Sequence, residues 1–132
     1  MAIELQLDVV EIVVADMGRS LALYRALGFD LPPEADDEPH VEATLANGLR
    51  VAWDLVSTIQ SFDPDWAAPT GSARMSLAFG CGSPAEVDAA FAELVAAGAE
   101  PHKEPWDAFW GQRYATLRDP DGNGIDLFAA LP

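Results

Sequence analysis

The chain of 132 residues carries 22 acidic side chains against 7 lysines and arginines, a formal charge of −15 at pH 7. This charge argues against nucleic acid and anionic membranes as partners, because both are bound through basic surface. The length suits one domain, and an apolar fraction of 50% is enough to bury a core. The single cysteine, Cys81, excludes an internal disulfide and a cysteine-based zinc site.

The first residues and the lengths of the apolar segments indicate where in the cell the protein is expected. Residues 1–11 include acidic side chains and lack the basic start of a secretory signal. No apolar run reaches the roughly 20 residues that a membrane-spanning helix needs. We therefore expect a cytoplasmic protein.

The first elements predicted are a strand, a helix and a short strand. Residues 5–14 are rich in β-branched side chains, which favour a strand. Asp16 is a good N-cap for a helix over 17–27, and Gly28 suits the left-handed position after a helix end. An extended pattern resumes over 29–31 and predicts a short second strand.

An acidic, proline-bearing segment over 32–39 predicts an exposed loop. The strands expected at 41–45 and 49–55 are joined by Asn47-Gly48, a strong hairpin signal. Residues 56–71 then form a connection that is long for a small domain, which is typical of functional or mobile loops.

The second half begins with a strand predicted over 74–79. Ser83 and Glu86 form the pattern of a capping box at the start of a helix that runs to about residue 97. A short strand is expected over 99–104, and a loop with two tryptophans over 105–110.

The chain is organised around its last hairpin, WGQRYATLRDPDGNGIDLF over 110–128. The turn lies at 119–124, where residues that fix or permit turn dihedrals are dense. Alternation places Asp126 on the opposite face from Ile125 and Leu127. Its carboxylate is therefore either solvated or directed toward a cavity.

The two halves repeat the same order of elements: strand, capped helix, glycine, strand, and hairpin with Asn-Gly. Asn47-Gly48 corresponds to Asn123-Gly124. This repeat predicts an α+β fold of two βαβββ modules, about 1–56 and 72–132, joined by a linker at about 56–71. One module alone leaves a sheet face unburied, so we expect paired modules that form a half-barrel sheet around a central cavity.

Three segments together resemble the vicinal oxygen chelate superfamily, which includes glyoxalase I, bleomycin-resistance proteins and extradiol dioxygenases. They are VVEIVVADMGRSLALYRALGF, SPAEVDAAFAELVAAGAEP and WGQRYATLRDPDGNGIDL, and the resemblance spans essentially the whole chain. It implies paired modules, a homodimer around a twofold axis, and a ligand cavity between concave sheets. It implies no single reaction, because one fold hosts many functions.

The resemblance also implies four metal-ligand positions, which are usually His, Glu or Gln. In chain order they fall on Val9, on Arg50 or in a shifted register Ala52, on Ser76 or Met75, and on Asp126. Only Asp126 keeps an acid, whereas a catalytic metal usually needs three protein ligands. Glu11 lies on the face of Val9, and its pairing with Asp126 would suit Mg²⁺ or Ca²⁺ better than a redox metal. We expect no metal and no cofactor.

Aromatic residues near the expected cavity mouth are candidates for stacking on a flat ligand. Trp53 is expected in the core, and for Arg113 a surface ion pair is favoured over a ligand contact. An acidic pair among aromatic rings suits a cationic, aromatic small molecule. The predicted ligand-binding residues are Glu11, Trp66, Trp106, Phe109, Trp110, Tyr114 and Asp126.

We interpret the chain as a metal-free small-molecule binding protein that sequesters a cationic or aromatic metabolite or antibiotic. Three alternatives stay open. One is a metal-dependent lyase or dioxygenase. Another is a metal-independent isomerase or cyclase, with Glu11 or Asp126 as the base and Tyr114 as the donor. The last is a structural module without a ligand.

Overall fold

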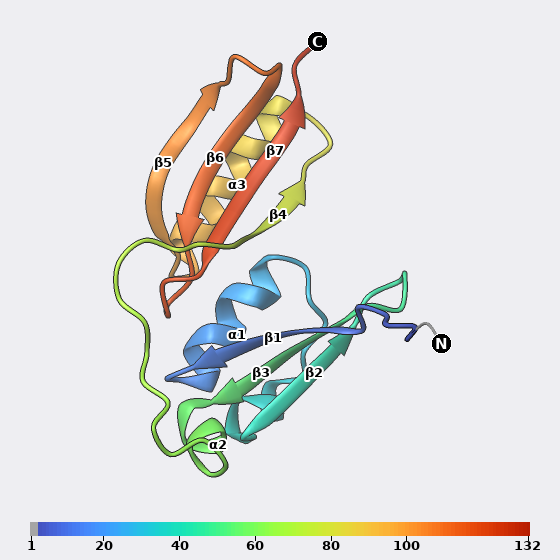
Figure 1. The fold of residues 1–132 in the computed structure, drawn as a ribbon. Coiled ribbons are helices and arrows are strands. Elements are labelled where there is room, and N and C mark those ends of the chain that lie inside the picture. The colour runs from blue at the N-terminus through green and yellow to red at the C-terminus, as the bar shows by residue number, and fades with distance from the viewer. Residues whose placement is uncertain (1–2) are drawn as a thin grey trace.

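The computed structural model describes residues 3–132 as two successive modules, each a sheet with a helix on one side (Figure 1). The first sheet has the order β1-β3-β2, with β1 parallel and β2 antiparallel to β3. The second has the order β4-β7-β6-β5, with only the β4–β7 pair parallel. The strands are β1 (Val9–Val14), β2 (His40–Thr44), β3 (Arg50–Leu55), β4 (Ser76–Gly80), β5 (Glu100–Asp107), β6 (Gln112–Arg118) and β7 (Gly124–Ala130).

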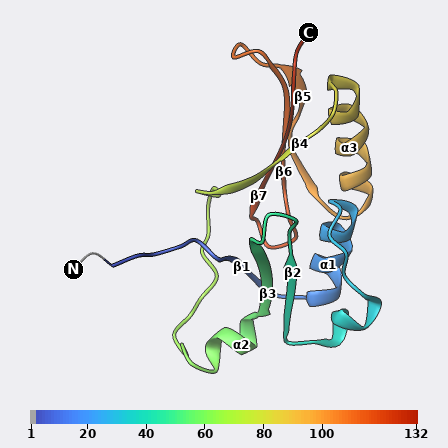
Figure 2. The same cartoon turned by 90° about the vertical axis from the view of Figure 1, so that its right-hand side faces the viewer.

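The α+β class and the paired modules are confirmed. No hydrogen-bonded ladder joins the two sheets within residues 3–132, so they flank one another as separate sheets. The helices α1 (Met17–Ala26) and α3 (Pro84–Ala96) lie on the same side of the two sheets (Figure 2). No helix among these residues is both long and apolar enough to cross a membrane.

Both long helices begin as their sequences predict. The Asp16 carboxylate accepts a hydrogen bond from the Arg19 amide at 3.0 Å, which caps α1. The Ser83 hydroxyl accepts from the Glu86 amide at 3.2 Å, and the Glu86 carboxylate accepts from the Gly82 amide at 2.6 Å. This arrangement satisfies two amide groups at the start of α3, as a capping box does.

The short strand expected over 29–31 is wrong. These residues pair with no strand and instead close the end of the first core. Phe29 packs edge-to-face on Trp53, with ring centroids 5.4 Å apart, and Leu31 is buried. The apolar character of this segment reflects tertiary packing rather than a sheet.

The acidic segment after it is also more ordered than expected. Residues Pro33–Asp37 form a 3-10 helix, η1, whose Ala35 is buried. The Arg25 guanidinium holds this turn against α1, because it donates to the Leu31 carbonyl at 2.8 Å and to the Asp36 carboxylate at 2.9 Å.

Other boundaries differ at the ends of strands. The first strand begins at Val9, and residues 5–8 are an extended arm. The linker starts with a short helix, α2 (Val56–Gln60), and then runs without regular structure to β4. Strand β5 continues to Asp107, so Trp106 lies on a strand rather than in the expected loop.

Two hydrophobic cores fill the space between the sheets and the helices. Trp53 is fully buried in the first core, as predicted. Leu23 of α1 belongs to the second core, while Leu77 of β4 packs against the first, so the cores interlock. The buried residues are Ile12, Val14, Met17, Leu21, Tyr24, Leu31, Ala35, Val41, Val51 and Trp53 in the first core, and Leu23, Val87, Leu94, Ala99, Ala115, Leu117, Ile125, Leu127 and Ala129 in the second.

The turn between β6 and β7 attaches the second module to α1. The buried Asp119 carboxylate accepts a hydrogen bond from the Tyr24 hydroxyl at 2.7 Å. It also accepts from the amides of Asp121 and Asn123, which shapes the turn. The Asp121 carboxylate accepts from the Ala15 amide at 2.9 Å, so two carboxylates of one turn reach the first module.

We expect Tyr24→Phe to lower the free energy of unfolding by about 1.5–3 kcal/mol, because it removes a hydrogen bond to a buried carboxylate. Urea denaturation followed by tryptophan fluorescence measures this loss. Tyr114→Phe is the matched control, because it removes the same atom at a partly exposed site. An equal or larger loss in the control would contradict the central role of the Tyr24–Asp119 contact.

Candidate functional site

Alternation along the strands leaves one face of each sheet free of helices. On the first sheet, Glu11, Ala52 and Glu42 form one row across β1, β3 and β2. On the second sheet, Tyr114 and Phe128 form one row of the open face. Thr116 and Asp126 form the next row.

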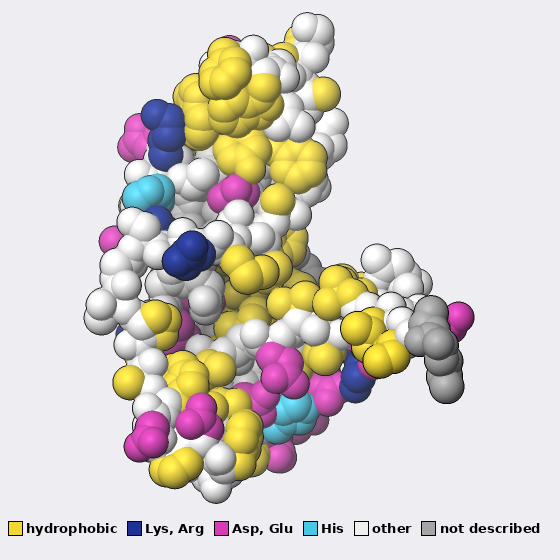
Figure 3. All heavy atoms as spheres, viewed as in Figure 1, with side chains coloured by type: hydrophobic (Ala, Val, Ile, Leu, Met, Phe, Trp, Pro, Cys, Tyr) yellow, Lys and Arg dark blue, Asp and Glu magenta, His cyan; other side chains and the backbone are white. Residues whose placement is uncertain are grey.

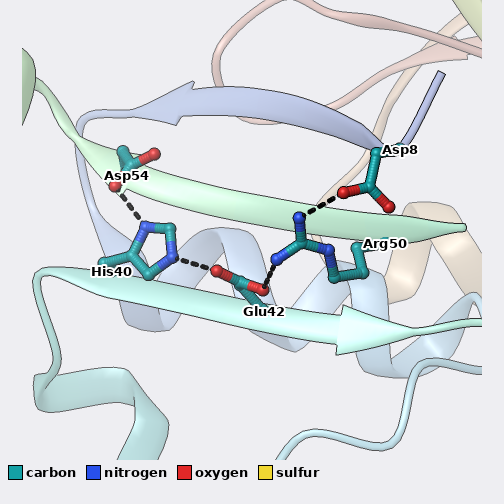
Figure 4. Close-up of polar contacts among 5 residues, drawn as sticks. All are labelled: Asp8, His40, Glu42, Arg50 and Asp54. Carbon is teal, nitrogen blue, oxygen red and sulfur yellow. Dashed lines mark hydrogen bonds and ion pairs between the residues drawn. The ribbon is translucent and has the colours of Figure 1, made fainter. Parts of the chain in front are cut away.

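The open face of the first sheet carries a chain of ion pairs (Figure 4). Arg50 bridges Asp8 at 2.7 Å and Glu42 at 2.9 Å. His40 bridges Glu42 through Nε2 at 2.7 Å and Asp54 through Nδ1 at 2.6 Å. Both partners of the imidazole are acceptors, so its two nitrogens donate only when it is protonated.

These contacts shift two pKa values in opposite directions. Hydrogen bonds to Glu42 and Asp54 raise the pKa of His40 above its usual value. Hydrogen bonds from His40 and Arg50 lower the pKa of Glu42. The five residues of this chain of ion pairs therefore satisfy one another, and their part of the sheet has the character of a structural surface.

A cleft of about 340 Å³ lies at the junction of the modules, where Figure 3 shows the surface hollowed. Glu11 of β1 lines it, together with Trp66 of the linker. The linker is held there because the Gln60 side chain donates to the Trp66 carbonyl at 3.1 Å and the Trp66 amide donates to the Asp63 carbonyl at 3.0 Å. The other lining residues are Val10, Ile12, Val13, Tyr24, Ala68, Pro69, Met75, Ser76, Leu77, Asp121, Asn123 and Gly124.

Five aromatic side chains form a cluster at the β5–β6 end of the second sheet, which is the hydrophobic patch at the top of Figure 3. Neighbouring rings have centroids 5.0–6.4 Å apart, mostly in edge-to-face contact. Phe109 is 96% exposed and Trp110 47% exposed, so the cluster faces solvent. We call this group the aromatic cluster; its members are Trp106, Phe109, Trp110, Tyr114 and Phe128.

Below the aromatic cluster, a carboxylate is held by two hydroxyl groups. Oδ2 of Asp126 accepts from the Tyr114 hydroxyl at 2.6 Å and from the Ser76 hydroxyl at 3.1 Å. No described side chain donates to the other oxygen, Oδ1. Partial burial, and then the hydrogen bond to Asp126, raise the pKa of Tyr114 to about 12.

A second hollow, of about 180 Å³, surrounds Asp126. Met75, Ser76 and Gly124 line both this hollow and the cleft, so the two adjoin. Glycine is required at 124, because a Cβ there would lie 2.8 Å from the Met75 carbonyl oxygen. The other lining residues are Ala73, Arg74, His102, Thr116, Leu117, Arg118 and Asp126.

The predicted ligand-binding residues fall into two neighbouring groups. Glu11 and Trp66 line the cleft between the modules. The other five lie together on the open face of the second sheet: Trp106, Phe109, Trp110, Tyr114 and Asp126. Glu11 and Asp126 thus line different hollows, and no contact joins the two carboxylates directly.

Several residues of this face were not predicted. Phe128 has the strand parity of Asp126 and pairs with Tyr114, so alternation alone was a sufficient signal. Arg74 reaches the second hollow from the end of the linker, and His102 reaches it from β5 at a point where the register with β6 shifts. No local sequence pattern reveals either placement. Arg113 lies on the helix side in ion pairs with Asp88 and Asp107, which agrees with the surface ion pair favoured from sequence.

The family model for the Glyoxalase/Bleomycin resistance protein/Dioxygenase superfamily matches residues 6–127. The chain belongs to this superfamily. A comparison with curated proteins finds no match.

Solved structures share the fold of this chain. A family enzyme from Burkholderia phytofirmans PsJN superimposes with a TM-score of 0.80 at 20% identity, over 96% of this chain and 100% of that chain. A superfamily protein from Nocardioides gives 0.73 at 23% identity, over 99% and 87%. The hypothetical protein SA1046 from S. aureus gives 0.77 at 20% identity, over 98% and 96%.

The internal repeat fixes which residues occupy the metal-ligand positions of the superfamily. The helix caps Asp16 and Ser83 align Val9 with Ser76, each seven residues earlier. Val9 pairs with Arg50 and Ser76 with Gly124, so the counterpart of Asp126, two residues after Gly124, is Ala52. The second position is therefore Ala52 rather than Arg50, the residue first expected.

This donor set does not fit a catalytic metal. Valine and alanine have no donor atom, and a serine hydroxyl is a weak ligand for iron, zinc or nickel. Among residues 3–132, no three His, Cys, Asp or Glu side chains are grouped so that they would hold a metal ion. The Glu11–Asp126 pair is not formed either, because these residues line different hollows.

We expect no tyrosine ionisation step near pH 10 when absorbance at 295 nm is followed. The chain has two tyrosines. The pKa of Tyr114 is raised to about 12, and burial beside Asp119 raises that of Tyr24. Asp126→Asn should move the Tyr114 step to lower pH, since it removes the carboxylate. A wild-type step at pH 10, with the fold intact by circular dichroism, would contradict the Tyr114–Asp126 contact.

Proposed function

We propose that this superfamily member binds a small aromatic molecule on the open face of its second sheet. The aromatic cluster is the observation that supports this function. Exposed rings such as Phe109 and Trp110 are costly in water, and a flat ligand that covers them gains about 25 cal/mol for each Å² of apolar surface buried. Edge and face contacts between rings add about 0.5–1.5 kcal/mol for each pair.

The scaffold favours such binding because it holds the rings in place. Trp106 and Tyr114 are cross-strand partners on β5 and β6, with ring centroids 5.7 Å apart. Trp110 is tied by its indole N–H to the Gln112 side chain at 2.8 Å. Groups fixed before binding lose little conformational entropy when the ligand arrives.

Sequestration without chemical conversion is the simplest activity that this geometry supports. The metal-dependent lyase and dioxygenase reactions are disfavoured, because the donor positions keep one carboxylate. The preference for a cation expected from sequence is also weakened. Tyr114 and Ser76 already donate to one oxygen of Asp126, and Arg74 and Arg118 line the same hollow.

A second candidate function is proton transfer without a metal. The contact that favours it is the 2.6 Å hydrogen bond between Tyr114 and Asp126 beside a hollow. In this reaction Oδ1 of Asp126 would take a proton from the ligand, and the Tyr114 hydroxyl would leave the protonated Asp126 to donate to a ligand oxygen that gains charge. Mass spectrometry of ligands incubated in D₂O tests it, because proton transfer exchanges a ligand C–H for C–D, and Asp126→Asn would abolish this exchange while binding persists.

We expect Trp110→Ala to weaken the binding of 4-hydroxybiphenyl, a neutral flat probe, by about 1–3 kcal/mol if the ring stacks on it. Isothermal titration calorimetry measures the affinity. Phe62→Ala is the matched control, because Phe62 is an exposed aromatic residue of the linker outside the cluster. Equal affinities of wild type and Trp110→Ala would show that the ring only anchors its hairpin.

We also propose that two copies of the chain associate. The arm before β1 projects away from the first module (Figure 2). Its apolar side chains alternate with polar ones, and Ile3, Leu5 and Leu7 are 75–91% exposed. Large apolar side chains in a regular extended pattern are typical of a surface that a partner covers.

We expect light scattering to give the mass of a dimer for the wild type and that of a monomer for the double variant Leu5→Glu, Leu7→Glu. The glutamates would put charge into the covered surface. Gln6→Glu adds charge to the other side of the same arm and should leave the dimer intact. A monomeric wild type at micromolar concentration would refute the association.

A further inference from the structure

Basic side chains are scarce in this protein, and they are unevenly placed. Of the 7 lysines and arginines, Arg25, Arg50 and Arg113 form ion pairs with carboxylates. No such pair within 4 Å involves Arg74 or Arg118 in the part of the chain that the structure describes, 3–132. These two arginines line one hollow, the one around Asp126.

The charge in this hollow is opposite in sign to that of the protein. Arg74 and Arg118 outweigh the one lining carboxylate, Asp126, and His102 adds positive charge when it is protonated. Asp126 keeps its charge, but two hydroxyl groups donate to its Oδ2 and leave only Oδ1 open to a ligand. Figure 3 shows basic side chains at the left edge of the second module and at its junction with the first. On a protein of charge −15, this hollow is a local site where two arginines favour an anion.

One lining residue of the hollow, Thr116, has a hydroxyl group without a partner. Oγ1 of Thr116 is buried and makes no hydrogen bond in the structure. Buried hydroxyl groups are normally paired, so an unpaired one calls for an acceptor. Thr116 and Arg118 lie two residues apart on β6, and Thr116 is opposite Asp126. A carboxylate that accepts from the Arg118 guanidinium would gain the Thr116 hydroxyl as a second donor after rotation about the Thr116 Cα–Cβ bond, since Oγ1 is not exposed to the hollow in the structure.

The aromatic cluster and the hollow lie along one line of the sheet. Tyr114, Thr116 and Arg118 share the open face of β6, in the order ring, hydroxyl, guanidinium. Tyr114 and Arg118 are four residues apart on the strand, a distance of roughly 13 Å. The flexible Arg118 side chain can bend toward the rings, so a ligand that reaches both can be shorter than this distance. A molecule with a flat ring at one end and an anionic group at the other matches this order.

We propose that the hollow lined by Arg74, His102, Thr116 and Arg118 binds the carboxylate of an elongated aromatic acid whose rings cover the aromatic cluster. This assignment rests on the proposed binding of aromatic molecules and adds the charge and the length of the ligand. It replaces the cation expected from the acidic residues alone with an anion.

Calorimetry on the full chain with matched biphenyl probes tests the assignment. Biphenyl-4-carboxylate should bind at least about tenfold more tightly than neutral 4-hydroxybiphenyl, and biphenyl-4-ylmethylammonium more weakly than either. The preference for the carboxylate should fall as salt is added, because the charges are near the surface.

Substitutions locate the charge that is responsible. Arg118→Gln should remove the preference for the carboxylate but leave the affinity for 4-hydroxybiphenyl unchanged, and Arg74→Gln, in an exposed linker position, should reduce it in part. Arg19→Gln is the matched control, since it makes the same change of net charge on α1. Circular dichroism checks that each variant is folded.

The outcomes separate the two proposals. Equal binding of the carboxylate and neutral probes, or tighter binding of the ammonium probe, would overturn the anion site and leave aromatic binding in place. Failure of all the biphenyl probes to bind would overturn both. Tighter binding of biphenyl-4-yl phosphate than of the carboxylate would overturn the assignment to a carboxylate. Loss of the preference in Arg19→Gln would trace it to overall charge and would also refute the site.

Discussion

The buried carboxylate of Asp119 is the contact on which the arrangement of the two modules depends. It shapes the turn between β6 and β7 through backbone amides and reaches α1 through the Tyr24 hydroxyl. A carboxylate that is 2% exposed is tolerated only because several donors surround it. The same turn places Asn123 in the lining of the cleft and Gly124 in the lining of both the cleft and the second hollow. The contact that joins the modules therefore also positions the boundary between the two hollows.

The two modules share a plan but use their open faces differently. The cross-strand pair Glu11–Ala52 in the first module corresponds to the pair Ala78–Asp126 in the second. The acid therefore lies on the first strand of the first module but on the last strand of the second, and the alanine the reverse. The first face is covered by ion pairs between its own side chains, whereas the second presents rings, hydroxyl groups and unpaired arginines. The two modules therefore present different side-chain chemistry on equivalent faces of one repeated unit.

Local patterns predicted most of the fold, because helix caps and tight turns depend on neighbouring residues. Asp16, Ser83 and the Asn-Gly turns fixed elements within one or two residues. Residues 29–31 and Trp106 were misplaced, since core packing and a long irregular pairing with β6 decide their conformation. At the site, alternation placed Asp126 on the face opposite Ile125 and Leu127, whereas its contact with Tyr114 depends on the register between β6 and β7. The arginines of the hollow were missed because the linker, β5 and β6 converge there only in three dimensions.

The chain of ion pairs on the first sheet links folding to proton uptake. Because the folded protein raises the pKa of His40 above 6.5, the stabilisation that His40 provides is complete below that pH and is lost as the pH rises through the higher, folded value. Glu42 behaves in the opposite way, since its lowered pKa gives stability that is lost on acidification. Unfolding at a pH between the ordinary and the raised pKa of His40 therefore releases protons, and an unbuffered solution of this acidic protein would become more acidic as the protein unfolds.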